Sequence, residues 1–197
     1  PFVASRSLFI HIPKAAGVSI TSSLYGNKTG DHRSIADYAL IFSKSDFDAF
    51  TKFTVVRHPL ARLRSAYQYL AAGGRNATDA QTFDQYISRY RDFRSFVCDL
   101  PDRPDIQALL HFRPQLSFLL LPGCSRLSID FFVRLEEIQK DFPRLQAVTC
   151  TKSDLSFLNK SEANDTSIAT PLDDEALHAI SKVFRGDFEI LGSAVRS

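Results

Sequence analysis

The sequence predicts an α/β fold, a P-loop-like three-layer arrangement in which a central parallel β-sheet is flanked by helices. Short apolar runs typical of buried strands alternate with longer segments of helical periodicity, and this alternation favours a parallel sheet. Two strand candidates run directly into a turn and a helix, which places both junctions at the carboxyl edge of the sheet. With 197 residues, 44% of them hydrophobic, the chain is expected to form one compact domain over residues 1–197.

The first strand candidate is Leu8–Ile12, an apolar run around one histidine that is too short for a helix. Pro13 ends it, because proline cannot donate a strand hydrogen bond. Small residues follow and open a helix that continues through Leu24. Small residues before a helix let backbone N–H groups close on an anion, whose charge the helix dipole favours. The loop consists of Lys14, Ala15, Ala16, Gly17, Val18 and Ser19.

Two other interpretations of this loop stay open: an ordinary strand-turn-helix, and an ATP- or GTP-binding loop. In the nucleotide-binding loop, a lysine directly precedes the hydroxyl residue that binds magnesium. Here Lys14 stands five positions before Ser19, at the opposite end of the turn. The strand candidate Ile129–Val133 runs into Arg134 rather than into a magnesium-binding aspartate. The pattern therefore indicates phosphate-like chemistry without a metal.

The second junction starts with the strand candidate Lys52–Val56 and has Arg57 at its carboxyl end. Pro59 suits the first turn of the helix that follows, where its missing N–H costs nothing. Ser65 lies roughly 9 Å along that helix, at 1.5 Å per residue. Arg57 and Ser65 could therefore hold one anion between them, although an arginine at a strand end is often solvated or paired with a carboxylate. Together the two junctions predict a site for a nucleotide with anionic groups at both ends.

The rest of the chain supplies the other elements of the predicted fold. We expect polar loops over Ala72–Asp79 and Asn159–Pro171. Helices are expected over Thr82–Cys98, Glu136–Ala147 and Asp173–Phe184. No linker, repeat or low-complexity stretch interrupts the chain.

Composition argues against several classes of protein. The net charge is only +2 at pH 7, which lacks the electrostatic footprint of a nucleic-acid-binding protein. The three cysteines, Cys98, Cys124 and Cys150, are dispersed without a nearby histidine pair, so we expect no metal site and at most one disulfide. No apolar run is long enough for a transmembrane segment. Three arginines, Arg89, Arg91 and Arg94, could meet an acidic glycan or form a solvated helix face.

Two features of the sequence bear on the compartment. Low cysteine content and small size favour the cytoplasm of a bacterium. All four asparagines, Asn27, Asn76, Asn159 and Asn164, lie in N-x-[ST] glycosylation sequons, which would suit the luminal domain of a Golgi protein instead.

Several segments resemble known enzymes. IPKAAGVS, residues 12–19, resembles the 5′-phosphosulfate loop of sulfotransferases, and VRHPLARLRSAY, residues 56–67, resembles their 3′-phosphate motif. The resemblance is greatest to the carbohydrate branch, the Golgi and bacterial-type sulfotransferases of family 2. It continues in the expected order over nearly the whole chain, through HFRPQLSFLL (111–120), IDFFVRLEEIQKDF (129–142), LNKS (158–161) and GDFEILG (186–192).

This resemblance implies PAPS (3′-phosphoadenosine 5′-phosphosulfate) as the sulfuryl donor and a hydroxyl-bearing acceptor, most often a carbohydrate. It implies that the loop from Lys14 to Ser19 binds the 5′-phosphosulfate, with Lys14 stabilising the phosphate as it leaves. Arg57 and Ser65 are then expected to bind the 3′-phosphate. Relatives close a loop over the nucleotide at the position of Lys160, which makes that residue a further candidate contact, although a lysine in a polar loop is often only solvated.

The resemblance also suggests a general base. His32 lies 25 positions before Arg57, where some glycan 2-O-sulfotransferases have a catalytic histidine. A positioned base of this kind typically contributes about 10²- to 10⁴-fold in rate. The other interpretation is a loop histidine that caps the helix beginning near Ser34. His11 is expected to be a core histidine in the middle of its strand.

The loop departs from the common family pattern. Ala15, Ala16 and Val18 stand where relatives usually have Thr, Gly and Thr. Ala16 must adopt a turn that glycine would enter more easily. Three functions therefore stay in view: sulfation of a carbohydrate hydroxyl, a magnesium-dependent nucleotide kinase, and a non-catalytic nucleotide- or glycan-binding relative.

Overall fold

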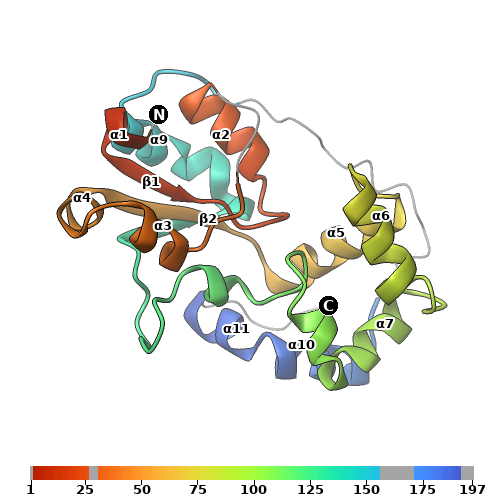
Figure 1. Ribbon diagram of the computed structural model, residues 1–197. Helices are drawn as coiled ribbons and strands as arrows, with labels where there is room; N and C mark the ends of the chain where they lie inside the picture. Colours follow the sequence, from red (N-terminus) through yellow and green to blue (C-terminus); the bar gives the residue numbers. More distant parts are fainter. Residues whose placement is uncertain (1, 27–30, 156–170, 192–197) are drawn as a thin grey trace. The chain divides into compact units, whose positions relative to one another are not determined.

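The computed structural model describes residues 2–26, 31–155 and 171–191, and Figure 1 traces the chain. These residues form two compact units, each assembled from separate stretches of sequence. The first unit contains residues 2–26, 31–57 and 115–155, and the second contains residues 58–114 and 171–191. The expectation of a single domain over residues 1–197 stays a prediction.

A three-stranded parallel sheet is the centre of the first unit. Its strands are β1 (Ser7–Ile10), β2 (Thr51–Val56) and β3 (Phe131–Arg134), in the order β1-β2-β3. Phe9 lies opposite Phe53 in the register of β1 and β2, and Val55 lies opposite Val133 in that of β2 and β3. Because all three strands are parallel, their carboxyl ends share one edge of the sheet. The predicted α/β fold with a central parallel sheet is confirmed.

Helices cover both faces of this sheet, which makes three layers. Helices α2 (Gly17–Tyr25) and α9 (Ile138–Thr149) pack on one face, and Figure 1 shows α3 (Ile35–Ile41) and α4 (Lys44–Ala49) on the opposite side. Strand side chains alternate between the two faces. The buried cluster beneath α2 and α9 contains Phe9, Ile20, Leu24, Phe53, Val55, Val133, Ile138, Phe142 and Leu145.

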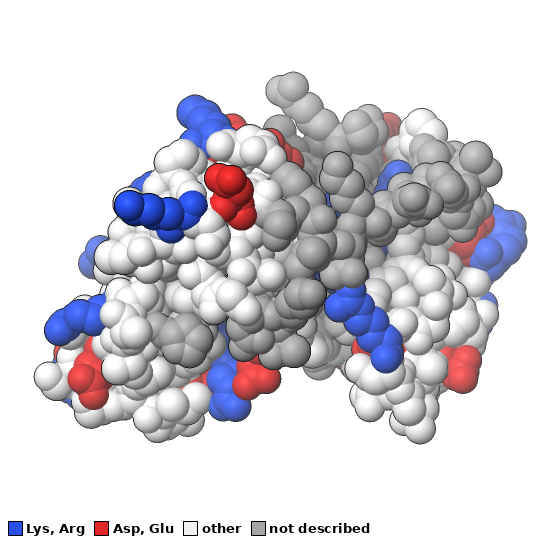
Figure 2. Space-filling model, turned by 90° about the horizontal axis from the view of Figure 1, so that it is seen from above, with Lys and Arg blue, Asp and Glu red and all other residues white. Residues whose placement is uncertain are grey.

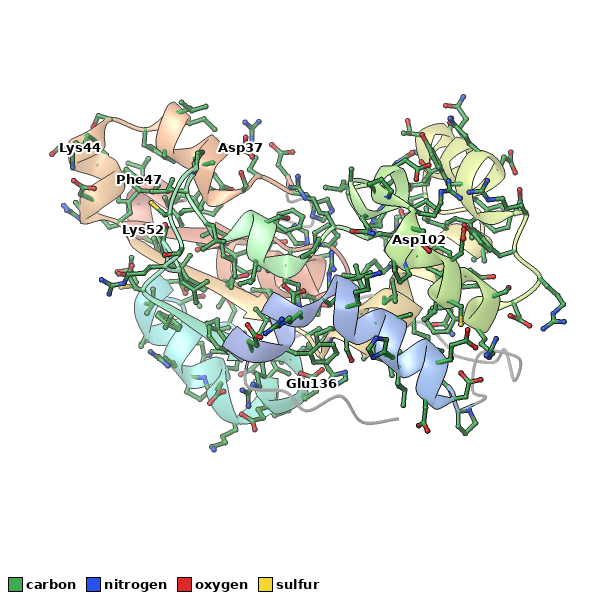
Figure 3. All side chains as sticks on the ribbon, turned by 90° about the horizontal axis from the view of Figure 1, so that it is seen from below. Asp37, Lys44, Phe47, Lys52, Asp102 and Glu136 are labelled. Carbon is green, nitrogen blue, oxygen red and sulfur yellow. The ribbon has the colours of Figure 1, made fainter. Side chains whose placement is uncertain are left out.

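A strand lysine ties α4 to the sheet. Lys52 in β2 donates hydrogen bonds from Nζ to the carbonyl oxygens of Phe47, at 2.9 Å, and Phe50, at 2.6 Å. Its ammonium group also lies 5.1 Å from the ring centroid of Phe47, and Figure 3 shows the two side chains together. A cation is favourable at a helix carboxyl end. The unit also contains α1 (Phe2–Ser5) and the 3-10 helices η3 (Gln115–Phe118) and η4 (Leu135–Glu137).

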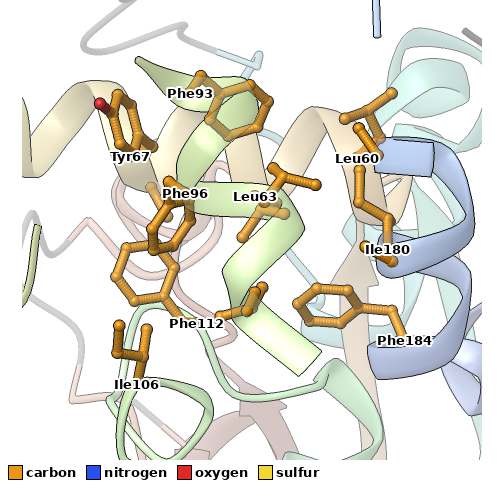
Figure 4. Packing of buried hydrophobic residues seen from close by; sticks show 14 of the residues in the cluster. Leu60, Leu63, Tyr67, Phe93, Phe96, Ile106, Phe112, Ile180 and Phe184 are labelled. Carbon is orange, nitrogen blue, oxygen red and sulfur yellow. The ribbon is translucent and has the colours of Figure 1, made fainter. Parts of the chain in front are cut away.

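The second unit is built around helix α5 (Pro59–Ala71), whose first helical residue is the proline that the sequence places there. Its apolar core collects side chains from α5, α7 (Phe93–Asp99) and α10 (Asp174–Val183), as Figure 4 shows. The other elements of this unit are α6 (Ala77–Thr82), the π-helix η1 (Phe83–Ile87), the 3-10 helix η2 (Leu100–Asp102), α8 (Pro104–Gln107) and α11 (Arg185–Leu191).

The single helix expected over Thr82–Cys98 is wrong. Asp92 interrupts it, because its side chain accepts a 2.8 Å hydrogen bond from the backbone N–H of Ser95 and thereby starts the new helix α7. Asn76 starts α6 in the same way, with its side chain accepting a 2.9 Å bond from Asp79 N, so the expected loop over Ala72–Asp79 ends as a helix.

The other boundaries differ by a few residues. Strand β1 ends at Ile10, two residues before the predicted end, and α10 matches the predicted helix to within one residue at each end. The helix expected from Glu136 begins with the tighter turn η4 before α9. The segment Asn159–Pro171 lies, apart from its last residue, outside the described residues.

Figure 2 shows basic side chains scattered among uncharged and acidic ones over the face that it presents. No helix in the described part of the chain is both long and apolar enough to cross a membrane. All three cysteines are free thiols. The described residues contain no cluster of three or more His, Cys, Asp or Glu side chains that could bind a metal ion.

Candidate active site

The loop between β1 and α2 has an unusual backbone. Lys14 has φ of 66° and Ala16, which precedes the first residue of α2, has φ of 59° and ψ of 21°. This left-handed conformation costs a residue with a Cβ atom about 1–2 kcal/mol. The expectation that Ala16 enters a turn better suited to glycine is therefore confirmed. Strained residues of this kind persist where the surrounding structure fixes them, often at functional sites.

The next residue, Gly17, has no room for a side chain, because a histidine ring approaches its backbone closely. A Cβ atom added to Gly17 would lie 1.7 Å from Cδ2 and 1.8 Å from Nε2 of His11. The His11 side chain is only 4% exposed and stacks on Phe9 at 5.8 Å between ring centroids. His11 directly follows β1 instead of lying in mid-strand, but it is buried as expected. Its ring packs directly against Gly17, a contact that the sequence did not reveal.

His32 packs against His11. Its Nδ1 atom is 3.0 Å from the backbone oxygen of His11, and the two imidazole rings are 4.2 Å apart between centroids. A carbonyl oxygen only accepts hydrogen bonds, so Nδ1 carries the hydrogen. In the neutral ring the lone pair is then on Nε2, the atom that can accept a proton. The structure thus brings the imidazole of His32 close to the loop between β1 and α2.

The alternative role for His32, as the cap of the next helix, is wrong. Ser34 caps α3 instead, accepting a 3.3 Å hydrogen bond from the backbone N–H of Asp37. The Asp37 carboxylate in turn accepts a 2.7 Å bond from Ser34 N, which completes a capping box. His32 is therefore not needed to start this helix.

Arg57 also reaches the loop. Its Nη1 atom donates a 3.3 Å hydrogen bond to the carbonyl oxygen of Lys14. Partial burial lowers the pKa of the Arg57 guanidinium from its ordinary value, and the negative charge of Glu136 opposes this shift. The Arg57 side chain thus connects the end of β2 to the loop that follows β1.

A buried glutamine holds the backbone of this arginine. Gln115, whose side chain is fully buried, accepts a 3.0 Å hydrogen bond from Arg57 N and donates a 2.8 Å bond to Arg57 O. Sequence reasoning assigned no role to Gln115. The available signal was its place in the segment HFRPQLSFLL, which resembles the sulfotransferases, next to Pro114.

Comparison with models of protein families supplies the identity. The model of the sulfotransferase family matches residues 5–192, nearly the whole chain. The chain belongs to the sulfotransferase family. Searches among curated proteins and solved structures gave no significant match. A sulfotransferase transfers a sulfuryl group from a sulfate donor to a hydroxyl-bearing acceptor.

Two predicted contacts of the sulfotransferase, Ser65 and Lys160, stay predictions. Ser65 is a nearly buried residue, 9% exposed, of helix α5 in the second unit, whereas Arg57 ends the first stretch of the first unit. Their joint binding of one anion stays a prediction. Lys160 lies outside the described residues, and so do three of the four sequon asparagines; Asn76 is the exception.

A second polar cluster, Tyr69 with Asp79 and His111, lies within the second unit. The Asp79 carboxylate accepts a 2.5 Å hydrogen bond from Tyr69, a 3.0 Å bond from the backbone N–H of Arg75, and lies 3.3 Å from Nε2 of His111. Burial alone would raise the pKa of Asp79, but the hydrogen bonds from Tyr69 and Arg75 hold it below its ordinary value. This sulfotransferase thus uses His111 to fix Asp79, which agrees with its lack of a catalytic signal.

The arginines considered for an acidic glycan have partners within the protein. Arg94 donates from Nε to Asp173 at 2.8 Å and from Nη2 to Glu175 at 2.6 Å, and Arg91 donates to Asp92 at 2.9 Å. These exposed pairs contribute little stability, because water and salt screen the attraction between their charges. They favour the solvated-face interpretation of this segment.

Proposed function

We propose that this sulfotransferase moves the sulfuryl group of PAPS to a hydroxyl of a carbohydrate acceptor by in-line displacement, without a metal. The observation that carries the proposal is the hydrogen bond between His32 Nδ1 and His11 O. This bond supports the proposal because it leaves Nε2 of His32 as the proton acceptor, close to the loop in which Lys14 and Ala16 have positive φ. The carbohydrate part of the proposal rests on the resemblance to the carbohydrate branch.

In this proposal the loop binds the 5′-phosphosulfate. Its support is the loop's make-up: small side chains at Ala15, Ala16 and Gly17, the N-terminus of α2, and the lysine at its start. The first N–H groups of a helix have no partner four residues back in the same helix, so they suit an anionic ligand. Val18 and Ser19 belong to this first turn, and Ser19 adds a hydroxyl donor.

Lys14 and His32 divide the chemistry of transfer. The acceptor oxygen forms a bond to sulfur as the bond from sulfur to the phosphate oxygen breaks. His32 Nε2 takes the proton of the attacking hydroxyl, and Lys14 neutralises the charge that develops on the departing phosphate. Preorganised charge of this kind acts in the transition state, where it lowers the barrier.

The far end of the nucleotide is assigned to Arg57 and Ser65, with Lys160 as an additional contact. Binding energy at the 3′-phosphate is remote from the reacting atoms and serves to position them. For the compartment, we propose the cytoplasm, with the Golgi lumen as the alternative that the sequons favour.

Radiolabelled sulfate transfer from PAPS into a panel of polysaccharides, oligosaccharides, small alcohols and phenols tests the proposal. We expect label in a carbohydrate, and Lys14→Ala should reduce it strongly while the fold is retained. Label only in a phenol or small alcohol would overturn the carbohydrate assignment and leave the transfer chemistry intact.

A thermal-shift comparison separates the alternatives. We expect PAP, the desulfated product, to raise the melting temperature, and MgATP to leave it unchanged. Stabilisation by MgATP alone would indicate a kinase-like enzyme. Stabilisation by PAP without label transfer to any acceptor would indicate a non-catalytic relative.

A further inference from the structure

Gln115 makes an unusual pair of contacts for a side chain. Its amide oxygen accepts from Arg57 N at 3.0 Å and its amide nitrogen donates to Arg57 O at 2.8 Å. Two strand residues directly opposite each other exchange the same pair of bonds. The Gln115 side chain therefore stands where a neighbouring strand would be, and it is fully buried there.

Gln115 contacts the backbone of Arg57 directly after the end of strand β2. Val56, the last residue of β2, pairs with Arg134 of β3, and the strand pairing of the described residues ends there, one residue before Arg57. An unpaired backbone N–H and C=O at a partly buried position carry a large desolvation cost. Gln115 satisfies both groups with one side chain, so it holds the backbone of Arg57 one residue beyond the sheet.

The side chain of Arg57 transmits this constraint to the loop. Its Nη1 bonds the carbonyl of Lys14, a residue held at φ of 66°. An unbroken series of contacts therefore runs from Gln115 through Arg57 to the lysine of the anion-binding loop. All three residues lie in the first unit.

We propose that Gln115 is a positioning residue for nucleotide binding, which acts by fixing Arg57 and touches no reacting atom. The inference rests on the proposed function, because Arg57 and Lys14 are assigned there to the two ends of PAPS. Loss of the amide should let Arg57 leave its place. The affinity for PAP should then fall about 2- to 10-fold, because the Arg57 side chain must be ordered again when the nucleotide binds.

A double-mutant cycle on PAP affinity, measured by calorimetry, tests this route. We expect Gln115→Ala to weaken binding by this factor and Arg57→Ala to weaken it at least as much. Because Gln115 acts through the Arg57 side chain, the double variant should bind PAP no more weakly than Arg57→Ala alone.

In turnover assays, Gln115→Ala should raise KM for PAPS more than it lowers kcat. Gln146→Ala, which removes another glutamine of the first unit that donates a single 3.0 Å bond to Ser153 O, should bind PAP as the wild type does.

Gln115→Glu keeps the proposal testable should Gln115→Ala fail to fold. A carboxylate only accepts hydrogen bonds and would face Arg57 O unfavourably, whereas a protonated carboxyl has one donor and one acceptor, as the amide has. Its affinity for PAP, divided by that of the wild type at the same pH, should therefore recover as the pH is lowered.

The outcomes are distinct. Wild-type affinity in Gln115→Ala, or additive losses in the double variant, would overturn the positioning role and leave the proposed function standing. A Gln115→Glu affinity ratio that does not change with pH would also overturn the positioning role. Absence of PAP binding by the wild type would overturn the proposed function, and this inference with it.

Discussion

His32 donates a hydrogen bond from Nδ1 to the backbone oxygen of His11, at 3.0 Å, across 21 positions of sequence. The bond fixes the tautomer of the imidazole and thereby leaves Nε2 as its proton acceptor. The partner is a backbone group directly after β1, so it stays in place whatever side chain is substituted at His11. The candidate base is therefore attached to the rigid edge of the sheet.

Removal of this imidazole should affect the chemistry rather than donor binding. We expect His32→Ala to lower kcat by about 10²- to 10⁴-fold, the usual contribution of a positioned base. Its affinity for PAP should stay within a factor of about two, because the loop keeps its other groups. Steady-state kinetics with PAPS and calorimetry with PAP measure the two quantities.

An exposed histidine supplies the control for this experiment. His178→Ala, in α10 of the second unit, should leave kcat unchanged. If His32→Ala retained the turnover of the wild type, His32 could not be the base.

Ala16 and Gly17 should respond in opposite directions to the exchange of one methyl group. Ala16→Gly relieves a left-handed alanine and should raise the free energy of unfolding by about 0.5–1 kcal/mol. Gly17→Ala drives a methyl group into the ring of His11 and should lower that free energy by about 1–3 kcal/mol. Urea unfolding of both variants measures the difference.

The Ala16→Gly and Gly17→Ala variants should also differ in turnover. Gly17→Ala displaces the His11 ring on which His32 rests, so we expect it to reduce turnover, whereas Ala16→Gly should not. Equal stability of the two variants would show that the loop does not have this conformation in solution.

Arg62 is a buried charge whose removal should be costly. Its side chain is 1% exposed, and it donates a 3.0 Å hydrogen bond to Arg113 O. Burial lowers its pKa to about 10, while the negative charge of the fully buried Asp187 opposes that shift. Arg62→Met leaves Asp187 without this cation and should destabilise the protein by about 3–5 kcal/mol.

Two further variants test the cause of that loss. Adding Asp187→Asn should restore part of the stability, because the uncompensated charge is removed. Arg64→Met, on the same helix but with its guanidinium over the ring of Phe93, should cost less than about 1 kcal/mol. Denaturant unfolding in which Arg62→Met and Arg64→Met were equally stable would contradict the role given to the buried charge.

Two tyrosines should make stability fall at alkaline pH. Burial raises the pKa of Tyr25 to about 12 and that of Tyr38 to about 12, against an ordinary value of 10.0. The unfolded chain therefore loses these protons first, so the stabilisation is complete below pH 10 and is lost as the pH rises toward about 12. Ultraviolet absorbance of phenolate, followed beside unfolding curves at several pH values, measures both effects.

Tyr25→Phe separates this effect from general alkaline unfolding. The variant loses the 3.1 Å hydrogen bond with Ser7 but also one group that titrates. Its stability should thus depend less steeply on pH between 10 and 12 than that of the wild type. An unchanged slope would argue against a buried Tyr25.

Much of the fold could be predicted from local patterns. The strand at Thr51–Val56, the helix from Pro59 and the helix Asp174–Val183 follow from apolar periodicity, a proline and an aspartate cap, all of which act over a few residues. The prediction failed at Asp92, where helical periodicity continues but a side chain that caps the backbone divides the segment.

The sequence by itself determined the fold class and the family, and it predicted an anion-binding loop with a lysine at its start. These follow from residue types at short, fixed spacings. Only the tertiary structure brought His11 to His32 and Gln115 to Arg57, across 21 and 58 positions. Neither contact has a local signal, because each depends on where the chain returns to the edge of the sheet. That edge is set by the packing of the whole first unit.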